Sequence, residues 1–143
     1  MYKKVILCAD DFGITPSVDK AIIRLIKKNR LSAVSCMTSS TIWLSESKLL
    51  KNYVDEVDIG LHFTLTSIKP IKYSKQLSNP NSLKNPKSLM IKALIRNLSY
   101  EEIKEEFIEQ LKAFEKGLGK KPDFIDGHHH IHQLPIIKKI IID

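Results

Sequence analysis

The sequence has little of what marks a membrane, secreted or disulfide-bonded protein. No apolar run approaches the roughly 20 residues that a membrane-spanning helix needs. The first residues lack the apolar segment and cleavage site of a signal peptide, which favours a cytoplasmic protein. Only two cysteines occur, Cys8 and Cys36, and we expect both to be small, buried strand residues without a disulfide.

Acidic residues are absent from one long stretch of the chain. No Asp or Glu occurs between residues 59 and 100, where seven Lys and Arg residues fall. The remaining chain carries sixteen basic and sixteen acidic residues, so this stretch alone accounts for the net charge of +7. Its part 67–88 is rich in Ser, Asn, Pro and Lys, which is typical of a solvated basic loop insertion. It has one tyrosine and no RNP-type or helix-turn-helix signature, so we expect no nucleic-acid partner.

What the sequence does contain is a regular alternation of apolar runs and amphipathic segments. Length and ordinary composition predict one domain, residues 1–143. The runs predict strands at 3–9, 32–38, 57–65 and 121–127, helices at 15–30, 44–53, 99–119 and from 135 onward, and a helical turn or two at 88–97. This alternation predicts an α/β fold with a parallel sheet.

The number of strands bears on how much of a larger fold is present. Four strand–helix units are about half of a closed β/α barrel, which needs roughly 250 residues. The last predicted helix runs to Asp143 without a capping residue. We therefore expect a shortened chain whose open sheet edge pairs with a second copy, as a homo-oligomer, or with a missing half.

Polar residues follow the predicted strands at the edge where α/β folds build their sites. The longest such run is "DGHHHIHQLP", residues 126–135, which holds four of the five histidines. If the strand continued, Asp126, His128, His130 and His132 would share one face about 6.5 Å apart, and His129 would point away. The run is therefore either a metal or catalytic site or a solvated basic loop.

Two other strand ends carry candidate site residues. His62 lies in the apolar "DIGLHFTLT", where a buried histidine needs a partner, either in the core or in a site shared with Thr64. Asp10 and Asp11 are adjacent carboxylates, which repel each other unless a cation or hydrogen bonds offset the charge. One of the two could bind a metal while the other acts as a general base; the alternative is a pair of solvated turn residues.

These groups together define a possible metal site. Two histidines, one carboxylate and open positions suit Zn²⁺, Fe²⁺ or Co²⁺ in a hydrolytic or redox site, whereas oxygen-rich surroundings with several waters suit Mg²⁺. We expect neither cysteine to lie near these motifs, so a structural zinc site with thiolate ligands is disfavoured.

The motifs "ADDFGIT", "IGLHFTLT" and "KPDFIDGHHHIHQLP", in this order, resemble the YdjC-like carbohydrate deacetylases, including the chitooligosaccharide (diacetylchitobiose) deacetylases. The resemblance covers essentially the whole chain but only the N-terminal part of the family. It implies a distorted β/α barrel, a divalent metal usually described as Mg²⁺, and hydrolysis of an N-acetyl group on an amino sugar or oligosaccharide. Carried over by motif, the metal ligands are Asp11, His62 and His128, and the catalytic base is Asp10.

Further residues follow from the same motifs. The resemblance implies that His130 and His132 line the site, and Asp126 and Thr64 are further candidates for lining it. Gly127 stands where the family often has Ser. The alternative function is a metal-binding but catalytically incomplete fragment, or a domain that serves assembly.

Overall fold

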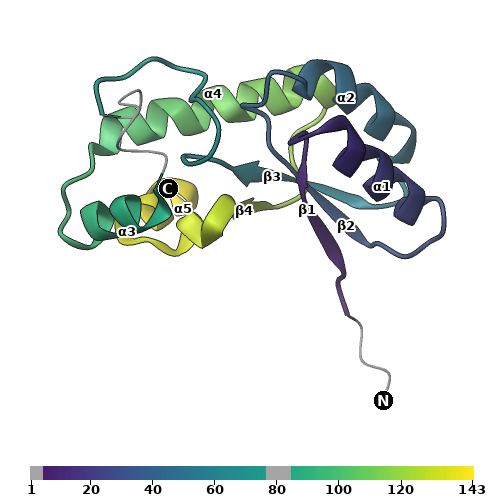
Figure 1. The fold of residues 1–143 in the computed structure, drawn as a ribbon, viewed down its shortest axis with the longest axis horizontal. Coiled ribbons are helices and arrows are strands. Elements are labelled where there is room, and N and C mark those ends of the chain that lie inside the picture. Colours follow the sequence, from purple (N-terminus) through teal and green to yellow (C-terminus); the bar gives the residue numbers. More distant parts are fainter. Residues whose placement is uncertain (1–4, 77–84) are drawn as a thin grey trace.

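The computed structural model describes residues 5–76 and 85–143 (Figure 1). The strands are β1 (Cys8–Phe12), β2 (Ala33–Cys36), β3 (Asp58–Phe63) and β4 (Ile125–Gly127). The helices are α1 (Pro16–Ile26), α2 (Trp43–Leu50), α3 (Pro86–Leu94), α4 (Tyr100–Leu118) and α5 (Pro135–Ile142), with short 3-10 helices η1 (Lys51–Tyr53) and η2 (His128–Gln133).

The four strands form one parallel sheet in the order β1-β2-β3-β4. Each strand therefore pairs with the next strand along the chain, and helices fill the connections, as parallel pairing requires. Helices α1, α2 and α4 follow one another along one side of the sheet, while α5 and α3 lie beyond β4 (Figure 1). The predicted α/β class, with parallel strands alternating with helices, is confirmed.

Helices α1 and α4 begin at the residues whose side chains cap them. The Thr15 side chain accepts a hydrogen bond from the Val18 amide at 3.3 Å, and Pro16 opens α1. Ser99 caps α4 in the same way through the Glu102 amide, and Gly119, at φ 77°, ends that helix. The predicted helices 15–30 and 99–119 are therefore confirmed apart from their terminal residues.

Packing between α2 and α4 is close because one residue lacks a side chain. The Trp43 ring lies over Phe114 with centroids 5.9 Å apart, and its Nε1 donates to the Ala113 carbonyl at 2.7 Å. A Cβ at Gly117 would lie 2.8 Å from the Trp43 ring. Glycine at this position therefore allows the indole to lie against the α4 backbone.

The first strand differs from the prediction. Strand β1 begins at Cys8, so the paired aspartates lie within the strand instead of following it. The preceding residues Val5, Ile6 and Leu7 are exposed, although a short apolar run of this kind is typical of a strand buried on both faces. The reason is topological: among the described residues β1 is an edge strand, and β2 is its only neighbour in the sheet.

The predicted basic loop is only partly tested. Residues 67–76 form no helix or strand, residues 77–84 lie outside the described part, and the loop ends earlier than predicted because Pro86 already opens α3. The Asn85 side chain caps this helix through the Lys87 amide at 3.0 Å. The segment 86–94 is therefore a full helix and not an isolated turn or two. No helix in the described part of the chain has the length and apolar character needed to cross a bilayer.

Candidate metal centre

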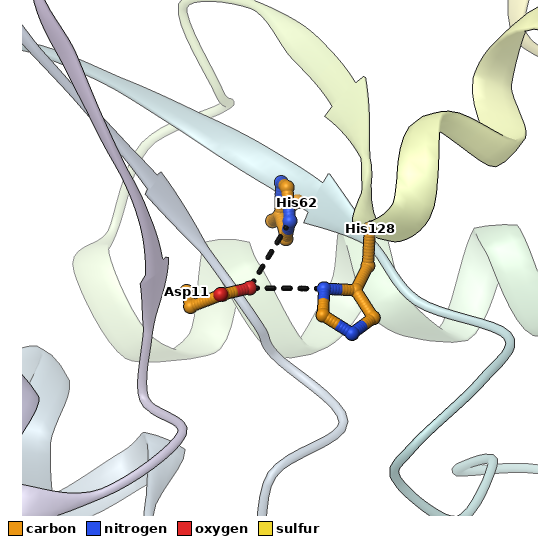
Figure 2. A group of neighbouring side chains, drawn as sticks. All are labelled: Asp11, His62 and His128. Carbon is orange, nitrogen blue, oxygen red and sulfur yellow. Dashed lines mark hydrogen bonds and ion pairs between the residues drawn. The ribbon is translucent and has the colours of Figure 1, made fainter.

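Asp11, His62 and His128 meet in space although they are far apart in sequence (Figure 2). Asp11 Oδ1 lies 3.2 Å from His62 Nε2 and 2.9 Å from His128 Nδ1. The three donor atoms are all within 4.8 Å of one another. They come from β1, from β3 and from the residue that follows β4, so the site lies at the carboxyl edge of the parallel sheet.

The curvature of the sheet is what makes this convergence possible. In a flat sheet β1 and β4 would lie about 14 Å apart, since neighbouring strands are spaced by ~4.8 Å. Yet Asp10 on β1 and Asp126 on β4 present carboxylate oxygens within 4.8 Å of each other. The sheet therefore curls, and side chains of its two outer strands meet on the concave side.

A local distortion of β1 directs both aspartates to the site. In a regular strand Asp10 and Asp11 would point to opposite faces. Here the pairing with β2 is irregular between Ala9 and Phe12, and Asp11 has φ 64°, in the left-handed region. Such a bulge re-aims side chains at strand ends, often beside active sites.

His62 is held in one orientation by a neighbouring carboxylate. His62 is 4% exposed, and its Nδ1 lies 2.7 Å from Asp126 Oδ1, which also accepts a hydrogen bond from the Ser35 hydroxyl. With Nδ1–H donating to Asp126, the lone pair of Nε2 faces Asp11. This carboxylate–histidine pair is the usual arrangement behind a metal-binding imidazole.

The electrostatics of the two histidines differ. Burial alone would lower the pKa of His62, but the hydrogen bond to Asp126 and the charges of Asp126 and Asp11 outweigh it, and the pKa is raised. Burial and the charge of His129 lower the pKa of His128. His128 is therefore a neutral imidazole near pH 7, the form that binds a cation.

The histidine run does not continue as a strand, so the predicted alternation is wrong. Strand β4 ends at Gly127, and His129 and His130 have φ values of 54° and 57°. His129 does not point away from the neighbouring groups: its ring centroid lies 3.9 Å from that of His128, and its Nδ1 lies 2.9 Å from Thr66 Oγ1. Sequence reasoning missed this contact because left-handed backbone is rare at residues other than glycine.

The remaining histidines lie farther along the same turn. His130 is exposed, and its ring centroid is 6.2 Å from that of His132, whose Nδ1 is buried without a hydrogen-bond partner among the described residues. Burial alone would raise the pKa of Asp126, but other influences, including the charge of His132, outweigh burial, and the pKa is lowered. A Cβ at Gly127 would lie 2.9 Å from the His132 backbone nitrogen, so the turn is packed closely against this glycine.

Thr64 is buried on the α4 side of β3. Its hydroxyl donates to the His62 carbonyl at 2.7 Å, and its amide donates to Gln110 Oε1 at 3.0 Å. Thr64 therefore fixes the backbone next to His62. A second hydroxyl, Ser67 Oγ, lies 3.2 Å from His128 Nε2, a contact that no sequence motif predicts.

A second group of donors adjoins the first. Atoms of Cys8, Asp10 and Asp126 lie within 4.8 Å of one another. The expectation that neither cysteine lies near the site motifs is therefore wrong for Cys8, which is half-buried, whereas Cys36 is fully buried as predicted. Burial raises the pKa of the Cys8 thiol to about 12, and the charges of Asp10 and Asp126 act in the same direction.

Asp19 stabilises the turn that carries Asp11, a role that no sequence motif predicts. Its side chain is 0% exposed, and its Oδ1 accepts a hydrogen bond from the Gly13 amide at 2.7 Å. Gly13, at φ 97°, and Asp11 belong to the same turn, which the Ile14 amide closes by donating to the Asp11 carbonyl at 3.1 Å. Burial raises the pKa of Asp19 to about 6 against the opposing Gly13 hydrogen bond, and neighbouring Glu46 raises it further.

The fold and these residues define an α/β protein with a candidate cation site of two histidines and one carboxylate. Residues 4–143 match the family model of YdjC-like proteins, so the chain belongs to the YdjC-like family, and the predicted resemblance is confirmed.

Relatives with assigned names agree on one kind of activity. The chain is 32% identical to a chitooligosaccharide deacetylase from Serratia marcescens, covering 99% of this chain and 55% of that protein. It is 26% identical to a carbohydrate deacetylase from Mus musculus, covering 98% of this chain and 46% of the relative. The chain thus spans about half the length of the curated relatives that it matches.

A solved structure supports the fold. A protein from Enterococcus faecalis, described as a cellobiose-phosphate cleavage protein, matches with a TM-score of 0.79 and 28% sequence identity. The match covers 94% of this chain and 52% of that one.

Proposed function

We propose that the chain carries the metal-binding part of a carbohydrate N-deacetylase, which hydrolyses N-acetyl groups of acetylated amino sugars or chito-oligosaccharides. The observation that carries the proposal is the convergence of Asp11, His62 and His128, with Asp10 next to them on β1. The names of the chitooligosaccharide and carbohydrate deacetylase relatives supply the substrate class. The four-stranded curled sheet would then form the first half of a distorted β/α barrel.

The donor set fits a divalent cation. One carboxylate oxygen and two imidazole nitrogens lie within 4.8 Å of one another, and His62 has the carboxylate partner that metal-binding histidines usually have. Two histidines and one carboxylate suit Zn²⁺ better than Mg²⁺, although the family resemblance implies Mg²⁺. Neutral His128 needs to lose no proton on binding, whereas the raised pKa of His62 means that a cation competes with a proton for its Nε2.

The chain's own groups have defined tasks in this reaction. A bound divalent cation would supply Lewis acidity to polarise the acetyl carbonyl and acidify the attacking water. Asp11, His62 and His128 would hold this cation through their converging donor atoms. The exposed carboxylate of Asp10 accepts the proton of the water. Asp126 and Ser35 keep His62 in one tautomer, and His130 and His132 line the approach of the sugar.

The test measures acetate and bound metal in parallel on the chain of residues 1–143. We expect acetate release from chito-oligosaccharides in the presence of Zn²⁺ or Mg²⁺, and its loss in Asp11→Asn and His62→Ala. Both variants should also weaken metal binding by on the order of a hundredfold, measured by calorimetry. Asp58→Asn is the matched control, because Asp58 lies exposed at the opposite end of the His62 strand.

Two outcomes would revise the proposal. Unchanged turnover in both ligand variants would reject the assigned ligands. Tight metal binding without acetate from any chito-oligosaccharide would favour the alternative, a metal-binding but catalytically incomplete chain.

A further inference from the structure

We propose that Cys8, Asp10 and Asp126 form a second cation site beside the first, selective for a thiophilic divalent cation such as Zn²⁺ or Cd²⁺. The site consists of one thiol sulfur and two carboxylates, contributed by β1 and β4. Its binding of a cation does not depend on the proposed deacetylase activity.

The geometry suits a four-coordinate ion. Cys8 and Asp10 are two residues apart on β1 and share the concave face, where the curl of the sheet brings Asp126. Zinc binds sulfur at about 2.3 Å and carboxylate oxygen at about 2.0–2.2 Å, so its tetrahedral ligands lie roughly 3.3–3.7 Å apart. The donors, at most 4.8 Å apart, need to close by only about 1 Å, which side-chain rotation provides. Asp10 is exposed, so solvent can supply a fourth ligand.

The charges around these groups give independent support for a bound cation. Within residues 5–76 and 85–143, no Lys or Arg forms an ion pair with Asp10, Asp11 or Asp126; Asp11 and Asp126 pair only with the histidines of the first site. Asp126 uses Oδ1 for His62 and Ser35, and Asp10 has neither an ion pair nor a backbone hydrogen bond in this described part. Among the described residues, three carboxylates thus gather without a lysine or arginine partner in a chain of net charge +7. One divalent ion at the first site leaves this group still negative.

The thiol decides which cation binds. Sulfur ligands select Zn²⁺ and its heavier analogue Cd²⁺ over Mg²⁺, which prefers oxygen. On binding, the Cys8 S–H bond is replaced by a bond from sulfur to the cation, and the proton leaves to solvent.

A cation bound at this site would affect the deacetylase function proposed above. Only this effect rests on the proposed function; the binding of the cation does not. A cation held by Asp10 removes this carboxylate from its task as the base. Zinc in excess of the first site would then inhibit the chain through Cys8, and magnesium would not.

The test is a Cd²⁺ titration of the metal-free chain, followed by ultraviolet thiolate-to-cadmium absorption and by equilibrium dialysis. We expect the absorption band in the unaltered chain and in Cys36→Ala, and its loss in Cys8→Ala together with one fewer bound Cd²⁺ per chain. Asp10→Asn should keep the thiol and weaken Cd²⁺ binding at this site by about tenfold or more. Circular dichroism of each variant establishes that it is folded.

Several results would overturn the proposal. The cadmium–thiolate band could persist in Cys8→Ala, or it could be absent in the unaltered chain. The number of bound Cd²⁺ ions per chain could also be the same in Cys8→Ala as in the unaltered chain. His62→Ala separates the two proposals: it should empty the first site and keep the cadmium–thiolate band. Loss of the band in this variant would show one shared site and reject a second one, whatever happens to acetate release.

Discussion

At the scale of single residues, the candidate site depends on buried side chains that are not among its candidate ligands. Asp19 is the clearest case, since a fully buried carboxylate binds the amide of Gly13 in the turn that carries Asp11. Its Oδ2 accepts no hydrogen bond from any described residue. Leaving a buried charge with one donor costs stability, which is why the pKa of Asp19 is raised.

This cost predicts a specific dependence of stability on pH. Asp19 has a pKa of about 6 in the folded chain against 3.8 for an ordinary aspartate, so the folded state holds an extra proton between these values. Stability therefore falls as the pH rises from about 4 to about 6, and the whole penalty, up to about 3 kcal/mol, is present above pH 6. Asp19→Asn keeps an oxygen for the Gly13 amide and cannot ionise.

The variant should therefore gain stability relative to the unaltered chain at pH 8 but not at pH 4, as measured by urea unfolding at both values. Asp55 lies exposed in the connection before β3, so Asp55→Asn serves as the control. An equal difference between Asp19→Asn and the unaltered chain at the two pH values would contradict the assignment.

At the scale of elements, the connection after β3 is held to α4 by two neighbouring glutamates with different surroundings. Glu106 is buried and accepts hydrogen bonds from the amides of Ile71 and Lys72 at 3.0 and 2.8 Å, and from Gln110. Glu105 is 52% exposed and pairs with the Lys72 ammonium at 3.0 Å. The connection also carries Ser67, so its position affects His128.

Replacement of these glutamates should have unequal effects. Glu106→Ala leaves two amides without acceptors, and we expect a loss of about 2 kcal/mol in the free energy of unfolding with faster hydrogen exchange at residues 71 and 72. Glu105→Ala, the matched control, should cost below about 1 kcal/mol because its ion pair is solvated. Similar losses and similar exchange rates in both variants would refute the distinction.

The elements also show what the sequence could reveal. Helices α1 and α4 were predictable because their caps are local, the side chains of Thr15 and Ser99 acting within one turn of backbone. The turn after β4 was not predictable, because a run of histidines does not indicate left-handed backbone at His129 and His130. The group of Asp11, His62 and His128 could be predicted by motif, but the contact of Cys8 with Asp10 and Asp126 needed the curl of the sheet, which no local pattern encodes.

At the scale of the whole molecule, the apolar surface is concentrated where the sheet ends. Val5, Ile6 and Leu7 are exposed beside β1, and Ile6 is 74% exposed. Helix α3 adds a second exposed apolar face of Met90, Ile91, Leu94 and Ile95. An edge strand flanked by such residues is a template for pairing with another chain.

We therefore expect the 143-residue chain to self-associate. Ile6→Lys should shift the sedimentation profile toward the monomer by placing a charge at the edge, as edge lysines do in natural sheets. Leu44→Lys, an exposed apolar residue on α2, is the control and should leave the profile unchanged. A compact monomer in solution scattering of the unaltered chain would disprove the expectation.

The order of the strands also governs when each part of the molecule can form. Because every strand pairs with its predecessor, the sheet can grow in step with synthesis on the ribosome, without waiting for distant sequence. Asp11 and His128, in contrast, are 117 positions apart, so their contact forms only after β4 has emerged. A cation bound by both Asp11 and His128 therefore cannot contribute to the early stages of folding. It can only stabilise the chain after the sheet has formed.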